Sequence, residues 1–299
     1  MIATPSTLHR SLELAGTLPA LMVAADRVAA TVIQGVHGRR RVGQGDSFWQ
    51  YRTYRDGDSA SQIDWRQSAR SRHLFVRETE WEAAASVWLW RDASPSMQYA
   101  SLRGIDTKAV RAELLILALA SLLTDASERV AVLGSGMRPI SGRLAVRRVA
   151  ETLLDESRNT SRTLPSLPPL VPLPAHGTIV LVSDWLDPLD KIEAVVRHYA
   201  SAGVRGHLVQ VLDPAEEDLP FNGHVKFEGL EAEGQHTIRR VEAVRQAYGA
   251  RLAAQKEGLQ RLARPANWTV HLHRTDRPPQ TALLSLYLAM ADLGRLAVA

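Results

Sequence analysis

Five short apolar runs recur along the last two thirds of the chain, and each is only four or five residues long. They cover residues 87–90, 130–133, 179–182, 208–212 and 268–272. Helical patterns are expected at residues 110–123, 143–157, 188–201, 242–263 and 280–297. Strands that are apolar on both faces and alternate with helices form a mostly parallel sheet with helices on both sides. The sequence therefore predicts an α/β fold.

Composition excludes several classes of protein. The 299-residue chain has no cysteine, so disulfides, thiolate catalysis, iron–sulfur clusters and cysteine zinc sites are excluded. Its net charge of +4 does not by itself demand a nucleic-acid partner. Prolines interrupt the charge-free stretch at residues 164–183, and the first residues lack the pattern of a signal peptide. We therefore expect a cytoplasmic protein without a membrane span.

Oxygen-bearing side chains follow two of the predicted strands. Asp92, Ser94 and Ser96 come directly after the first strand, and Asp184 follows the third. In an open parallel sheet, ligands bind at the carboxyl ends of the strands, where the strand order reverses. Carboxylate and hydroxyl oxygens suit Mg²⁺ or Mn²⁺, and such a set leaves a coordination position open for an acidic group of a partner. Ordinary turn and helix-capping roles for the same residues remain an alternative.

Two stretches of the chain resemble known families. The octapeptide from Trp90 to Met97 resembles the metal-ion-dependent adhesion site of von Willebrand factor A domains. A second stretch is similar to the signature of a bacterial family of unknown function that has an A-like domain and is typically encoded beside MoxR-type AAA ATPases. Its matching motifs are Gly57-Asp58, Ile63-Asp64-Trp65-Arg66, Ser68-Ala69-Arg70 and Val76-Arg77-Glu78.

These resemblances imply a von Willebrand A-like domain over residues 85–299, with a metal ion held by Asp92, Ser94, Ser96 and Asp184. The adhesion site also uses a threonine from a loop after another strand, and Ser141 is its nearest counterpart here. Trp185 stands where many A domains have glycine. The resemblance further implies a MoxR-type ATPase as partner.

Residues 37–77 have a composition of their own. They hold nine arginines and four aspartates, a net charge of +5, with tryptophans and tyrosines between them. In a short helix here Arg66 and Arg70 would lie one turn apart, able to contact carboxylates of a partner. Two alternatives stay open: an internal Arg–Asp network that fixes this segment onto the main domain, and contact with nucleic acid.

Together these patterns predict an N-terminal region over residues 1–84, consisting of a helix and the arginine-rich segment packed on the A-like domain, which carries a hairpin-like insertion near 221–241. His271 and His273 share a face of the last strand, but we expect packing or surface roles rather than zinc binding because no third ligand is near.

We expect a non-catalytic adaptor that acts with the ATPase in assembly or maturation of client complexes. The alternatives are a metal-dependent hydrolase that uses Asp92 and Asp184, and a nucleic-acid-binding module built on residues 37–77.

Overall fold

A computed structural model of the chain divides into two compact units. The main unit comprises residues 1–36 and 85–299, and the small unit comprises residues 37–84. The structure describes residues 20, 22–33, 48–54, 63–71, 73–79, 85–158, 165–230 and 234–296. The helix over residues 22–33 belongs to the main unit, where it contributes Ala25 and Val28 to the core.

The main unit is built on a five-stranded sheet in the order β4-β3-β5-β6-β9, and every neighbouring pair is parallel. The strands are β3 (Ser86–Arg91), β4 (Arg129–Val132), β5 (Thr178–Ser183), β6 (Arg205–Leu212) and β9 (Thr269–Arg274). Each overlaps one of the apolar runs of the sequence, which confirms the α/β fold with a parallel sheet. The first strand of this sheet in the chain is β3. The next strand, β4, pairs on one side of it and β5 pairs on the other, so the strand order reverses between β3 and β5.

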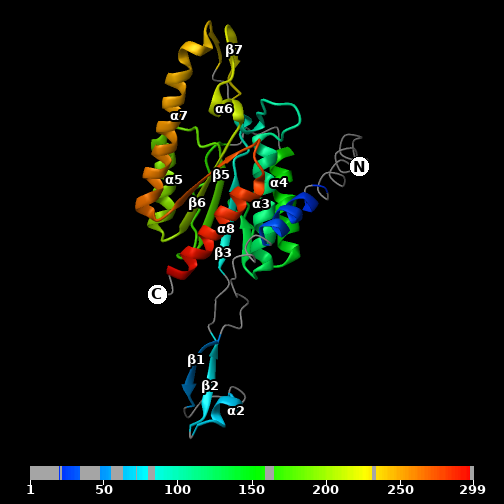
Figure 1. Cartoon of the computed structure of the whole chain (residues 1–299), viewed down its shortest axis with the longest axis vertical. Helices are drawn as coiled ribbons and strands as arrows, with labels where there is room; N and C mark the ends of the chain where they lie inside the picture. Colours follow the sequence, from blue (N-terminus) through cyan, green and yellow to red (C-terminus); the bar gives the residue numbers. More distant parts are fainter. Residues whose placement is uncertain are drawn as a thin grey trace, which may run out of the picture. The chain divides into compact units, whose positions relative to one another are not determined.

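Helices cover both faces of this sheet (Figure 1). One face carries α3 (Lys108–Asp125), α4 (Arg143–Arg158) and α8 (Pro279–Leu296), and the other carries α5 (Leu189–Ser201) and α7 (Val241–Ala263). Short helices are η2 (Pro95–Gln98), α6 (Pro214–Asp218) and η3 (Arg264–Ala266). The predicted helical stretches coincide with the five long helices to within a few residues at each end.

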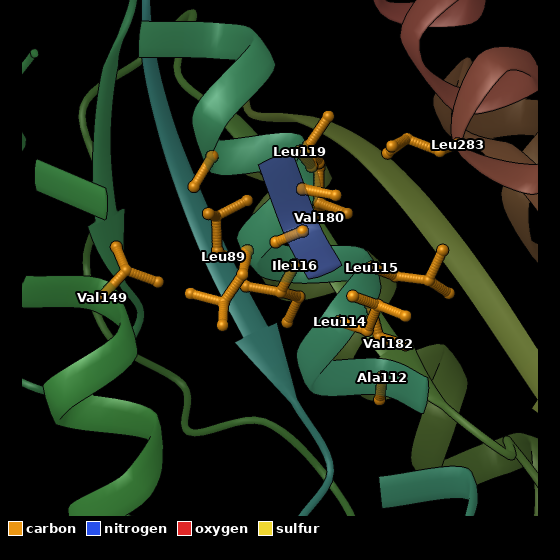
Figure 2. Packing of buried hydrophobic residues seen from close by; sticks show 14 of the residues in the cluster. Leu89, Ala112, Leu114, Leu115, Ile116, Leu119, Val149, Val180, Val182 and Leu283 are labelled. Atoms are coloured by element: carbon orange, nitrogen blue, oxygen red, sulfur yellow. The ribbon is translucent and has the colours of Figure 1, made fainter. Parts of the chain in front are cut away.

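The core lies in two layers because each strand is apolar on both sides. On β3, Val87 and Leu89 face the layer under α3, whereas Trp88 and Trp90 face the layer under α5 and α7. Figure 2 shows Leu89, Val180 and Val182 of the strands packed beside α3, which contributes Ile116 and Leu119, with Leu283 of α8 near them. Most of α3 is buried, which explains why its sequence is apolar almost all round.

The small unit contains an antiparallel pair, β1 (Phe48–Thr53) and β2 (Phe75–Thr79), and one short helix, α2 (Trp65–Ser68). Asp64 caps this helix: its Oδ1 accepts hydrogen bonds from the backbone N–H groups of Arg66 at 3.0 Å and Gln67 at 2.9 Å. The hydroxyl of Ser68 donates to the Asp64 carbonyl at 2.7 Å and accepts from the N–H of Phe75 at 2.9 Å. Asp64 and Ser68, which stand in the motifs that resemble the family signature, therefore have a structural role: they connect α2 to β2.

The length of α2 means that Arg66 and Arg70 do not lie on the same helix. We expected Arg66 and Arg70 one turn apart on a helix, but α2 ends at Ser68, and Arg70 follows in a turn whose N–H bonds the Gln67 carbonyl. The helix begins at Trp65 because Asp64 caps it there. Both arginines are exposed. The Gly57-Asp58 motif lies outside the described residues.

A hairpin precedes α7 in the main unit. Strand β7 (Val225–Glu228) pairs antiparallel with β8 (Gln235–Ile238) in a sheet of their own. In the described part of the chain, none of the helices combines the length and the apolar character needed to cross a bilayer.

A glycine on β6 permits the close approach of a tryptophan. A Cβ atom added at Gly206 would lie 2.0 Å from Cδ2 of Trp268, whose indole N–H donates to the Val204 carbonyl at 3.1 Å. We expect Gly206→Ala to lower the free energy of unfolding by about 1–3 kcal/mol through overpacking. Chemical denaturation measures this change.

Gly249 provides the matched control, since it lies in α7 with no atom within 4 Å of an added Cβ. Gly249→Ala should raise stability by about 0.5–1 kcal/mol, because alanine loses less backbone entropy in a helix. Equal effects of the two substitutions would contradict the packing described here.

Candidate functional site

The four residues proposed from the sequence meet at one edge of the main sheet. Asp92 follows β3 directly and Asp184 follows β5, and these two strands are neighbours at the point where the strand order reverses. Ser94 and Ser96 lie on the turn and the short helix η2 that come after Asp92. The structure therefore brings all four side chains together at the carboxyl end of the sheet, where open α/β folds bind ligands.

Asp92 is fully buried, and both of its carboxylate oxygens are engaged. Oδ1 accepts from the backbone N–H of Ser94 at 2.7 Å, and Oδ2 accepts from the hydroxyl of Ser183 at 2.8 Å. Burial raises the pKa of Asp92 to about 6, and the hydrogen bonds from Ser94 and Ser183 oppose that rise. Asp92 thus fixes the turn after β3 to the end of β5.

Hydroxyl groups continue from this turn to the second aspartate. The hydroxyl oxygens of Ser94 and Ser96 are 3.1 Å apart, and the Ser96 hydroxyl donates to Oδ2 of Asp184 at 3.0 Å. The other carboxylate oxygen of Asp184 accepts from the N–H of Leu186 at 3.2 Å, and its backbone carbonyl accepts from the Gln210 side chain at 2.7 Å. The ends of β3, β5 and β6 are thereby joined.

A lysine that sequence reasoning missed completes the cluster. The Nζ atom of Lys108 donates to Oδ2 of Asp184 at 2.8 Å and to Oε1 of Glu216 at 2.5 Å, and its side chain is only 1% exposed. Burial by itself lowers the pKa of Lys108, but the two carboxylates outweigh it and raise that pKa above its ordinary value. Lys108 is therefore a buried ammonium ion.

The position of Lys108 at the start of a helix is the feature of the sequence that could have identified it as a member of this cluster. It is the first residue of α3, a helix that follows β3 and therefore begins at the carboxyl edge of the sheet. A charged residue in the first turn of a helix that is otherwise mostly apolar lies close to the strand ends. That inference needs the helix boundary, which periodicity alone places only to within a few residues.

Glu216 reaches the cluster from α6. Asp213 caps this short helix, with its Oδ1 accepting from the N–H of Ala215 at 2.8 Å, and Oε2 of Glu216 accepts from the N–H of Asp213 at 2.8 Å. Oδ2 of Asp213 accepts from the N–H of Ser101 at 2.9 Å. We call the following set the strand-end network: Asp92, Ser94, Ser96, Lys108, Asp184 and Glu216.

The network does not fit a divalent metal as it stands. The Lys108 ammonium and the Ser96 hydroxyl both bond the same oxygen of Asp184, so a metal ion at that oxygen would lie beside a fixed positive charge. Among the described residues, no group of three or more histidine, aspartate or glutamate side chains is arranged to hold a metal. Binding of Mg²⁺ or Mn²⁺ at this site is thus a prediction from the sequence alone, and the Lys108 ammonium beside Asp184 opposes it.

Trp185 and Ser141 are the two positions at which the sequence departs from the adhesion-site pattern, and the structure shows the surroundings of both. Trp185 adopts a φ of 52°, a left-handed conformation that favours glycine, and its fully buried indole donates to the Val209 carbonyl at 3.1 Å. Ser141 is exposed and follows Ile140, which forms an isolated bridge to Val130 on β4.

The family of the chain follows from a sequence match that covers more than half of it. A family model described as protein of unknown function DUF58 matches residues 50–258. The chain belongs to the DUF58 family. Every member of the strand-end network lies inside the matched range, and so do the signature residues around α2, whereas β9 and α8 lie beyond it.

This DUF58 chain is also similar to proteins of mycobacteria. Uncharacterized proteins of Mycobacterium bovis and Mycobacterium tuberculosis are 25% identical to it, over 93% of this chain and 90% of theirs. Among solved structures, an aerotolerance-related membrane protein of Bacteroides fragilis aligns with a TM-score of 0.39 and 17% identity. That alignment covers 70% of this chain and 100% of the other.

Three histidines on β6 and β9 are buried, and one of the two singled out in the sequence, His271, belongs to a chain of side chains between β6, β9 and α8. Nδ1 of His207 lies 2.7 Å from the hydroxyl of Thr269, and the same hydroxyl lies 2.8 Å from Nε2 of His271. Nδ1 of His271 is 3.2 Å from the hydroxyl of Ser285. His273 lies near Arg111 at 3.4 Å. Burial lowers the pKa of His207 to about 3 and the pKa values of His271 and His273 to about 4.

These low pKa values predict a loss of stability in acid. Between pH 6.5 and about 4 the unfolded chain protonates these histidines while the folded chain keeps them neutral, so the unfolded state binds more protons. The free energy of unfolding should therefore fall as the pH drops through this window, by about 1.4 kcal/mol per pH unit for each such histidine. The raised pKa of Asp92 acts in the opposite direction below about pH 6 and offsets the contribution of one histidine. Urea denaturation at a series of pH values measures the slope.

His207→Asn should flatten that slope by the contribution of one group, whereas His236→Asn, at an exposed position on β8, should leave it unchanged. The same slope in wild type and His207→Asn would contradict the assignment.

Proposed function

We propose that this DUF58 protein is a non-catalytic adaptor whose docking surface is the carboxyl edge of the main sheet. The supporting observation is that three large apolar side chains are exposed next to the strand-end network or its helix cap. Leu102, Val110 and Leu186 are 54%, 40% and 43% exposed. Leu186 and Val110 follow Asp184 and Lys108 by two residues, and Leu102 follows Ser101, which bonds the cap of α6. Protein interfaces combine exposed apolar side chains with polar groups, so these three side chains supply the apolar part of such a surface.

The chemistry of the network supports binding rather than catalysis. A general base must reach its substrate and must be able to accept a proton. Asp92, whose pKa burial raises to about 6, has no exposed surface, and Lys108 is held as an ammonium ion by Asp184 and Glu216. The network therefore serves to hold the surrounding loops in place for a partner.

The partner that this proposal names is a MoxR-type AAA ATPase, with the adaptor acting in assembly or maturation of client complexes. The ATPase comes from the resemblance of the motifs between Gly57 and Glu78 to the bacterial family typically encoded beside such enzymes. In the small unit, Arg66 and Arg70 are exposed beside Trp65, which is 65% exposed, so an acidic surface of a partner has cationic and aromatic contacts there.

A charge placed in the apolar rim tests the docking surface. Leu186→Glu should weaken binding of the purified ATPase at least tenfold, because burying a carboxylate in an interface without a partner costs about 2 kcal/mol or more. Calorimetry or biolayer interferometry measures the dissociation constant, and circular dichroism checks that the variant remains folded.

Leu230→Glu is the matched control, since Leu230 is 49% exposed and follows β7 in the hairpin, which contributes no residue to the strand-end network. Binding that is equally weakened by both substitutions, or by neither, would contradict the proposed surface.

A further inference from the structure

One buried cation connects three elements at the strand ends. Lys108 projects from the start of α3, Asp184 follows β5, and Glu216 lies on α6, which follows β6. We infer that Lys108 is the resident cation of the strand-end network, and that a divalent metal binds there only when this ammonium is removed. This inference concerns the occupant of the site and does not depend on the proposed ATPase partner.

The location of Lys108 is unfavourable unless the two carboxylates offset it. The first turn of a helix carries the positive end of the helix dipole, which repels a cation. Burial of an ammonium ion also removes its hydration. Asp184 and Glu216, at 2.8 Å and 2.5 Å from Nζ, supply the negative charge that makes this position stable. Lys108 therefore serves as the counter-ion of these two carboxylates.

The geometry around Asp184 shows why ammonium and metal exclude each other. The ammonium lies 2.8 Å from Oδ2 of Asp184, whereas Mg²⁺ binds oxygen at about 2.0–2.1 Å. A divalent ion at that oxygen would therefore lie within a few ångströms of Nζ, inside a buried site where like charges repel strongly. The oxygens of Asp92, Ser96 and Asp184 keep hydrogen bonds that do not involve Lys108, because Ser94 and Ser183 bond Asp92, Leu186 bonds Asp184, and the Ser96 hydroxyl donates to Asp184.

Mn²⁺ binding to the full-length protein tests the inference directly. Electron paramagnetic resonance counts free Mn²⁺, and calorimetry gives the affinity. Wild type should show no saturable site with a dissociation constant below about 1 mM. Lys108→Ala should gain one Mn²⁺ per chain, and Mn²⁺ should raise the melting temperature of that variant but not of wild type. Adding Asp184→Asn to Lys108→Ala should abolish the gained site.

Lys191→Ala is the matched control, because Lys191 is an exposed lysine on α5 and its loss should create no site. Saturable binding of one Mn²⁺ by wild type, lost in Asp92→Ala, would overturn the inference and establish the metal site expected from the sequence. The comparison of wild type with Asp92→Ala uses no lysine variant, so it still tests the inference if Lys108→Ala folds poorly. A folded Lys108→Ala that binds no Mn²⁺ would also overturn it.

The inference and the proposed function fail in different ways. With Lys108 as resident cation, capture of the ATPase by wild type should be unchanged by EDTA, provided the nucleotide state of the ATPase is kept constant by omitting nucleotide. Loss of capture in EDTA would contradict the inference while supporting the docking surface. No capture under either condition would contradict the proposed function alone.

Discussion

The bonds from the Lys108 ammonium to Asp184 and Glu216 are the interaction on which the candidate site depends. A buried charge must be paired, since an uncompensated one costs several kcal/mol. One side chain thus ties the start of α3 to the ends of β5 and β6. Asp92 ties the end of β3 to the same place through Ser183. A continuous polar network therefore joins the ends of β3, β5 and β6.

The sheet explains why this network forms where it does. Strands buried on both faces have no polar side to present, so polar side chains collect at the strand ends, where the backbone leaves the sheet. At that edge each carboxylate of the network accepts a hydrogen bond from a backbone N–H group that follows a strand, and exposed leucine and valine side chains lie close by in sequence. A rigid polar centre surrounded by apolar groups can hold a binding surface in one shape. This is the physical basis of the docking role that we propose.

The small unit shows how a family signature can have a structural cause. Asp64 and Ser68 lie within the range that matches the DUF58 family model, and both form hydrogen bonds that start α2 and join it to β2. The exposed side chains of Trp65, Arg66 and Arg70 take no part in those bonds. Within the described residues of this unit, these three are accordingly the positions we assign to partner contact.

The sequence by itself determined the fold class, the five strands and the long helices, because apolar side chains on both faces of short runs leave few arrangements other than a helix-covered parallel sheet. It also identified Asp92, Ser94, Ser96 and Asp184 as neighbours, since parallel strands end at the same edge. Only the tertiary structure brought Lys108 and Glu216 to these residues. They lie 108 positions apart in the chain and on separate helices, and no periodicity records which charged residue of one helix meets which carboxylate of another. The physical reason is that a charge pair forms through space, where helix boundaries and packing decide the distance.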